Sequence, residues 1–185
     1  MNKLMIVSAL LCGSTLAITG CQSTEGQLKT GNPLSQPVLK SMIKTTDAKK
    51  MEVGQMYLRP VDGGVQVYGK LMNLTPGQTV ALHIHDTGSC DMMGKAAGGH
   101  FNPDNKPHAH PDNMNGHAGD LPNLTANSDG IATINYVNKK ISAAETGKYS
   151  VNRLAFIVHS GADDYMSQPS GASGDRIACG IIEKI

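Results

Sequence analysis

The sequence predicts an all-β domain, a sandwich or barrel built from short strands. From about residue 49 to the C-terminus, apolar and polar residues alternate over several short runs, as is typical of half-buried strands. Turn signals rich in Gly, Asp and Pro separate these runs. Two connections are long and irregular, and such loops in a compact domain are usually functional.

The first runs predict a hairpin followed by one further strand. In MEVGQMYLRPVDGGVQVYGKLMNL, residues 51–74, two alternating runs flank Asp62-Gly63-Gly64, a typical hairpin turn. The segment QTVALHIHD, residues 78–86, alternates as a separate strand.

The later runs predict the remaining strands and both long loops. NLTANSDGIATINYV, residues 123–137, contains a Ser-Asp-Gly turn signal, and RLAFIVHS and RIACGIIEKI supply two more strands near the end of the chain. The long loops are expected over Thr87–Pro122 and Ser160–Asp175.

Residues 1–20 are predicted to be a signal peptide that takes no part in the fold. Lys3 precedes an apolar run that is too short, and too interrupted by Gly13, to span a bilayer stably. The ending Ile-Thr-Gly-Cys at residues 18–21 resembles the bacterial lipobox, in which the cysteine is acylated. We therefore expect Cys21 to carry a lipid, and Gln22 favours anchoring to the outer membrane. Cleavage elsewhere would instead give a soluble periplasmic protein.

Residues 21–48 are expected to form a flexible lipidated tether, because they are polar and show no clear periodicity. A short helix over Val38–Ile43 is an alternative within this segment. The β domain is then expected over residues 49–185.

Composition narrows the function further. The chain has 185 residues and a formal net charge of +1. Such a small charge does not favour nucleic-acid binding or a strongly basic surface that would bind a membrane. Contact with a membrane is expected through the lipid alone.

Of the four cysteines, Cys12 leaves with the signal peptide and Cys21 takes the lipid. Cys90 and Cys179 remain, and in an oxidising compartment this pair predicts a disulfide.

The histidines predict metal binding. The chain has seven histidines, and those at 83, 85, 100, 108, 110 and 117 lie close together in sequence. His83 and His85 are two apart on a predicted strand, so both imidazoles are expected on one face. The segment from residue 98 to 123 has too little apolar content to offset its ordering entropy by burial, whereas metal–ligand bonds would order it.

The number of ligands predicts two adjacent sites. Three nitrogens and one carboxylate suit tetrahedral zinc, and one such set is His100, His108, His117 and Asp120. Three further imidazoles, too many for the same ion, come from His83, His85 and His159. Imidazole suits copper as well as zinc.

Five segments together resemble one family. HIHDTGSC, GGHFNPDNKPHAHP, GHAGDLPNLTANSDGIA, VHSGADD and GDRIACGII occur in the order found in copper–zinc superoxide dismutases. The resemblance covers about residues 51–185 and is greatest to the bacterial periplasmic branch. It implies an eight-stranded Greek-key flattened barrel with two long functional loops. It also implies one copper and one zinc per subunit, and conversion of two superoxide anions to O2 and H2O2 by a copper that is reduced and reoxidised in turn.

The resemblance further implies a role for each matching residue. The implied copper ligands are His83, His85, His100 and His159, and the implied zinc ligands are His100, His108, His117 and Asp120. His100 would bridge both ions and couple electron transfer to proton transfer. Asp163 would link the two sites through hydrogen bonds to His85 and His108. Arg176 would attract the anion beside copper, and Cys90 would pair with Cys179.

Some alternatives stay open. His110 stands where the family usually has Gly, and is either a surface residue or an alternative ligand. The bacterial branch contains dimers and monomers, so the sequence leaves a homodimer open. The alternative function is a non-enzymatic copper and zinc buffer in the periplasm; against it stands Arg176, which a buffer does not need.

Overall fold

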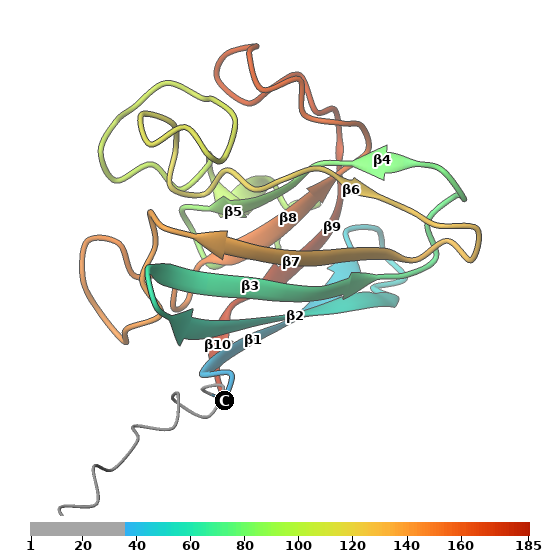
Figure 1. Cartoon of the computed structure of the whole chain (residues 1–185). Coiled ribbons are helices and arrows are strands. Elements are labelled where there is room, and N and C mark those ends of the chain that lie inside the picture. Colours follow the sequence, from blue (N-terminus) through green and yellow to red (C-terminus); the bar gives the residue numbers. More distant parts are fainter. Residues whose placement is uncertain (1–35) are drawn as a thin grey trace, which may run out of the picture. The chain divides into compact units, whose positions relative to one another are not determined.

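The computed structural model describes residues 36–185, so the expected signal peptide, Cys21 and most of the tether lie outside the described residues. The described chain consists of strands, loops and one short 3-10 helix (Figure 1). In chain order these elements are β1 (Leu39–Thr45), β2 (Glu52–Val61), β3 (Gly64–Leu71), β4 (Thr79–Val80), β5 (Leu82–His85), η1 (Lys95–Ala97), β6 (Leu124–Thr125), β7 (Ala132–Asn138), β8 (Ala155–His159), β9 (Arg176–Ile181) and β10 (Glu183–Lys184). No helix between residues 36 and 185 has the length and apolar character needed to cross a membrane.

Eight strands form one antiparallel sheet in the order β5–β8–β9–β1–β2–β3–β7, with β10 paired to β1. The short strands β4 and β6 form a separate two-stranded ribbon. Strands distant in sequence are neighbours in space: β3 pairs with β7, and β1 lies between β2 and β9. The sheet curls around one core (Figure 1). The predicted all-β Greek-key barrel is confirmed.

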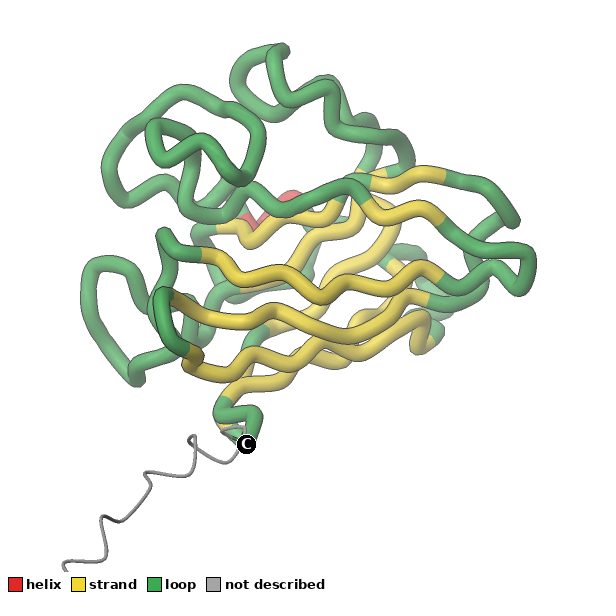
Figure 2. Tube along the Cα trace, viewed as in Figure 1, coloured by secondary structure: helices red, strands yellow, loops and turns green. Residues whose placement is uncertain are grey.

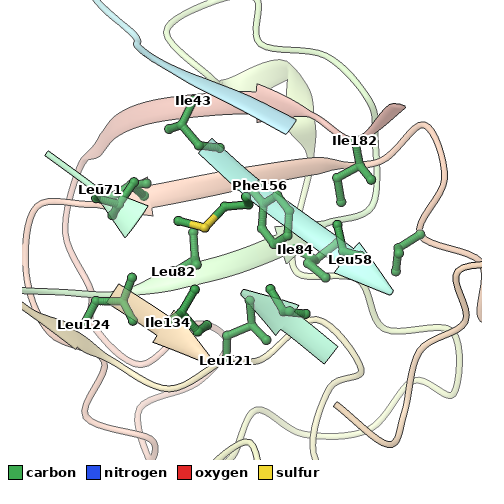
Figure 3. Close-up of a cluster of buried hydrophobic side chains, with 14 of the residues drawn as sticks. Ile43, Leu58, Leu71, Leu82, Ile84, Leu121, Leu124, Ile134, Phe156 and Ile182 are labelled. Atoms are coloured by element: carbon green, nitrogen blue, oxygen red, sulfur yellow. The ribbon is translucent and has the colours of Figure 1, made fainter. Parts of the chain in front are cut away.

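Alternation along the strands builds the core. On β2, Met56 and Leu58 are buried, whereas the intervening Tyr57 faces the other side of the sheet and is half-buried. Leu58, Leu82 and Phe156 converge from three strands (Figure 3). Each fully buried side chain of this size stabilises the fold by about 1.5–3 kcal/mol. The predicted hairpin is also confirmed, because β2 ends at Val61 and β3 begins at Gly64.

The expectation for the segment before residue 49 was wrong in two respects. Residues 39–45 form strand β1 rather than the short helix, and this strand belongs to the barrel rather than to a tether that extends to residue 48. Leu39, Ser41 and Ile43 are all buried, with exposed residues between them. A serine at the middle inward position conceals the period-two pattern in the sequence.

Both predicted long loops are confirmed. The chain is irregular apart from η1 between β5 and β6, and again between β8 and β9 (Figure 2). Gln168 joins the two loops: its Oε1 accepts the His108 N–H at 2.8 Å, and its Nε2 donates to the His108 carbonyl at 2.8 Å. The predicted disulfide is present, and it ties Cys90 in the first loop to Cys179 on β9.

Candidate metal centre

Two neighbouring strands and one loop bring four imidazoles together. His83 and His85 lie on β5, and His159 ends the adjacent strand β8. The outer edge of β5 pairs with the long loop, which places His100 opposite His85 and Asp120 opposite His83. All four histidines are buried, and each offers a ring nitrogen within 4.8 Å of the others. We call His83, His85, His100 and His159 the first cluster.

Hydrogen bonds fix the tautomers of three of these rings. The carbonyl of Gly98 accepts from His85 Nδ1 at 3.0 Å, and the carbonyl of Gly174 accepts from His159 Nδ1 at 3.1 Å. A carbonyl only accepts, so both nitrogens carry the proton. His83 donates through Nε2 to Asp163 at 2.7 Å. The opposite nitrogen of each ring is therefore left with a free lone pair.

Those lone pairs have no partner within the protein. Among residues 36–185, five buried side-chain polar atoms lack a hydrogen bond, and four of them are His83 Nδ1, His85 Nε2, His100 Nε2 and His159 Nε2. An unsatisfied buried polar group costs about 1–3 kcal/mol. Four such atoms close together indicate a site for a cation, which would accept all four lone pairs.

Burial keeps these rings neutral. Desolvation lowers the pKa of His83 to about 3, of His85 to about 2 and of His159 to about 4, and it also lowers the pKa of His100. A histidine must be deprotonated to bind a metal. The first cluster is thus ready to bind at neutral pH.

A second cluster, His100, His108, His117 and Asp120, lies on the other side of the His100 ring. Asp120 Oδ1 is 2.9 Å from His100 Nδ1, 3.1 Å from His108 Nδ1 and 3.4 Å from His117 Nδ1. Tetrahedral zinc with bonds of about 2.0 Å would separate its ligand atoms by about 3.3 Å. The spacing and the donor set therefore fit zinc closely.

His100 belongs to both clusters. Its Nδ1 lies in the second cluster, 2.9 Å from Asp120, while its unpartnered Nε2 lies in the first. The sequence-based expectation that one imidazole would face both sites agrees with this arrangement.

Besides the shared His100, Asp163 also connects the two clusters, through hydrogen bonds to one histidine of each. Its Oδ2 accepts from His83 Nε2 at 2.7 Å, and its Oδ1 accepts from His108 Nε2 at 2.9 Å. The expectation that Asp163 would accept from His85 was wrong. His85 donates to the Gly98 carbonyl, and the ring that donates to the Asp163 carboxylate is that of His83. Burial lowers the pKa of His108, but hydrogen bonds to Asp120 and Asp163 outweigh it and raise that pKa to about 9.

Arg176 lies beside the first cluster. It pairs with His159 across β8 and β9, and its positive charge contributes to the lowered pKa of His85 and His159. Its guanidinium donates to the carbonyls of Gly94 and Gly98, each at 2.7 Å. The Gly98 carbonyl thus accepts hydrogen bonds from both Arg176 and His85. This shared acceptor fixes the guanidinium of Arg176 relative to the imidazole of His85.

The sequence did not reveal two residues that hold Asp163. Asn123 clamps its backbone, accepting the Asp163 N–H and donating to the Asp163 carbonyl, both at 2.8 Å. Gly171 packs against its carboxylate, so a Cβ there would overlap that group and lie 2.7 Å from His108 Nε2. The sequence contained only a weak signal for these two residues. Asn123 is a single asparagine after Pro122, and Gly171 is one of several glycines in its loop.

His110 lies outside both clusters. Its side chain is 52% exposed and packs edge-on against Tyr165, with 4.6 Å between ring centroids. This arrangement favours the surface alternative over a ligand role.

Comparison with known proteins agrees with the site. Residues 52–182 match the profile of a family described as copper/zinc superoxide dismutase (SODC). The chain belongs to the copper/zinc superoxide dismutase family. Relatives include "Superoxide dismutase [Cu-Zn] 1" of Aquifex aeolicus (strain VF5), 34% identical with 78% of this chain and 88% of the relative covered. "Superoxide dismutase [Cu-Zn]" of Francisella tularensis subsp. holarctica (strain LVS) is 40% identical, with 71% and 73% covered.

A solved structure shows the same superoxide dismutase fold. The crystal structure of a SOD-like protein from Bacillus subtilis has a TM-score of 0.69 and 35% identity, covering 77% of this chain and 96% of that one. The family uses copper and zinc, and the two clusters of this chain can each bind a metal ion. Since this neighbour is titled only SOD-like, membership of the family does not by itself decide activity.

Proposed function

We propose that this protein is a superoxide dismutase, with copper at the first cluster and zinc at the second. One observation carries the proposal: four buried imidazole nitrogens without partners converge beside the Arg176 guanidinium. A ligand set made only of imidazoles suits copper, and a set with three imidazoles and a carboxylate suits structural zinc. When bound, copper supplies one-electron redox chemistry and zinc supplies none.

The histidines of the first cluster have two different roles in the proposed reaction. His83, His85 and His159 would hold copper, and their other ring nitrogens donate to Asp163, Gly98 and Gly174, respectively. His100 Nδ1 lies in the second cluster, where it would hold zinc, so its Nε2 could carry a proton whenever that nitrogen did not hold copper. Two superoxide anions need two protons to give O2 and H2O2, and His100 Nε2 is placed to deliver one.

Arg176 attracts and orients the anion. Its charge lies beside His85 and His159, and its hydrogen bonds to Gly94 and Gly98 hold the guanidinium in one place. A fixed guanidinium offers several N–H donors to a small anion. A non-enzymatic metal buffer, the second candidate, would need the two clusters but no such group.

A matched pair of histidine variants tests the proposal. His159→Ala removes a ligand of the first cluster only, and we expect it to abolish superoxide dismutation while zinc stays bound. His110→Ala removes an exposed histidine outside both clusters and should leave turnover and both metals unchanged. Full turnover in His159→Ala would contradict the copper assignment.

The cellular setting is proposed from the sequence alone. A signal peptide over residues 1–20, acylation of Cys21 and a tether to the barrel would place the enzyme on the periplasmic side of the bacterial envelope, anchored to the outer membrane. Contact with the membrane would be through the lipid, and a homodimer remains a candidate assembly. Radiolabelled palmitate in the wild type but not in Cys21→Ser would support the anchor, and no label in either would contradict it.

A further inference from the structure

The long loop between β5 and β6 supplies all four side-chain ligands of the second cluster, yet much of it is polar. Its portion from residue 112 to 118 precedes and includes His117 and is mostly exposed or polar. The hydrophobic core holds this segment only at its end, where Ala118 is buried, and burial does not offset the entropy lost when the exposed residues 112–115 are ordered. Polar contacts are therefore needed to hold residues 112–115 in place.

One such contact comes from the loop itself, since Lys106 Nζ donates to the Met114 carbonyl at 2.9 Å, and strand β7 and the residues that follow it provide others. The inward residues Ala132 and Ile134 of β7 are buried in the core. Further along the same alternation the inward residues are polar: Tyr136 is half-buried and Asn138 is fully buried. Lys140 follows two residues later and is also half-buried. We call Tyr136, Asn138 and Lys140 the β7 ladder.

Each member of the ladder donates a hydrogen bond to the loop. Tyr136 Oη donates to Asp112 Oδ1 at 3.1 Å, and Lys140 Nζ donates to the Asn113 carbonyl at 3.2 Å. On the other side of His117, Asn138 Nδ2 donates to the Ala118 carbonyl at 2.9 Å. The C-terminal end of β7 lies beneath this loop (Figure 1).

We propose that the β7 ladder positions His117 and Asp120 for zinc, acting as a set of positioning residues that do not touch the metal. The ladder contacts the backbone on both sides of His117, whose N–H in turn donates to Asp120 Oδ2 at 3.1 Å. The segment is therefore held at residues 112–113 and again at Ala118. His117 lies between these points, so its position is fixed, as is the start of the turn that leads to Asp120. None of the contacts from the ladder reaches a residue of the first cluster.

The bond types suggest which members matter most. A hydrogen bond from a charged donor is stronger than one from a neutral donor, so we expect Lys140 to contribute more than Tyr136. The ammonium of Lys140 is half-buried, and desolvation lowers its pKa, so it has already lost water that the Asn113 carbonyl replaces. Asn138 also accepts the Lys140 N–H at 2.8 Å, and its removal would disturb the strand itself.

The test therefore uses Tyr136→Phe and Lys140→Met, singly and combined, in the full chain. Each change removes the donor and keeps most of the side-chain volume. Matched controls are Tyr57→Phe, on the outward face of β2, and Lys139→Met, the exposed neighbour of Lys140. Zinc affinity is measured by competition with a chelator, copper affinity likewise, and cobalt(II) absorption reports the geometry of the second cluster.

We expect the double variant to bind zinc at least about 10-fold more weakly, as is typical when supporting contacts of ligands are removed. Its cobalt spectrum should change, its copper affinity should not, and both controls should match the wild type. Lys140→Arg keeps a cationic donor and should restore most of the zinc affinity.

Zinc affinity equal to that of the wild type in the double variant would overturn this inference. So would an equal loss of copper and zinc affinity, which would indicate a general weakening of the fold. The inference rests on the proposed function only in assigning zinc to the second cluster. A wild-type protein that binds no zinc there would contradict the proposed function itself.

Discussion

Asp163 Oδ2 accepts a hydrogen bond from His83 Nε2 at 2.7 Å, deep in the protein, where both side chains are fully buried. The other oxygen of the same carboxylate accepts from His108 Nε2. One carboxylate thus sets the tautomer of a ligand in each cluster, and the backbone of Asp163 is in turn held by Asn123.

Asp163→Asn should weaken both metal sites. The amide NH2 cannot accept a hydrogen bond, so one of the two rings loses the acceptor that keeps its Nε2 protonated. We expect zinc affinity to fall by about 10- to 100-fold, as for other supporting contacts of ligands, with a smaller loss for copper. Asp164→Asn changes the adjacent exposed carboxylate, which contacts Ser167, and should have no effect. Equal affinities in both variants would show that the bridge is dispensable.

Gly171→Ala should have the same consequence by a steric route. A Cβ at this position would overlap the Asp163 carboxylate, and it would crowd His108 Nε2. Gly63→Ala is a matched control, because Gly63 has φ +82°, similar to the φ +68° of Gly171, with no atom within 4 Å of the new Cβ. Chelator competition should reveal weaker zinc binding in Gly171→Ala alone. A similar loss in both would assign the effect to backbone strain.

Arg176→Ala should slow superoxide turnover by about 10-fold or more while leaving both metals bound, since a fixed charge that orients the reacting anion is lost. Arg176→Lys keeps a charge but not the planar fork that contacts Gly94 and Gly98 together, so it should recover only part of the rate. Binding of azide, a small anion, should weaken in parallel. An unchanged rate in Arg176→Ala would remove this residue from the mechanism.

Replacing Cys90 and Cys179 with alanine should lower the free energy of unfolding by about 2–5 kcal/mol. The disulfide closes a long loop, with a sequence separation of 89, and ties the segment that contains η1 to β9. Guanidinium denaturation of the wild type in reducing buffer should match the double variant. A wild type whose stability is insensitive to reduction would contradict this expectation.

Much of the architecture could be predicted because it depends on local patterns. The turn between β2 and β3 needs a residue in the left-handed region, and Gly63 supplies it. The long loops stand out because they lack hydrophobic periodicity, and His83 and His85 were predicted together because a strand alternates. Strand β1 was missed because the buried Ser41 interrupts an otherwise apolar inward set.

What could not be predicted depends on the path of the loops. Which of His83 and His85 turns its ring toward Asp163 is decided by where residues 160–175 pass over β5, and sequence spacing does not contain that information. The β7 ladder had a signal that was available, namely polar residues at the inward positions of Tyr136 and Asn138. Only the structure shows that these side chains meet a loop there rather than the hydrophobic core.

The most direct measurement is the rate of superoxide decay catalysed by the protein after loading with copper and zinc and confirmation that both are bound. The account predicts dismutation close to the diffusion limit, with a rate that falls as ionic strength rises because the attraction of Arg176 for the anion is screened. No catalysis by protein that demonstrably holds both metals would contradict the proposed function, and the metal buffer would become the better account.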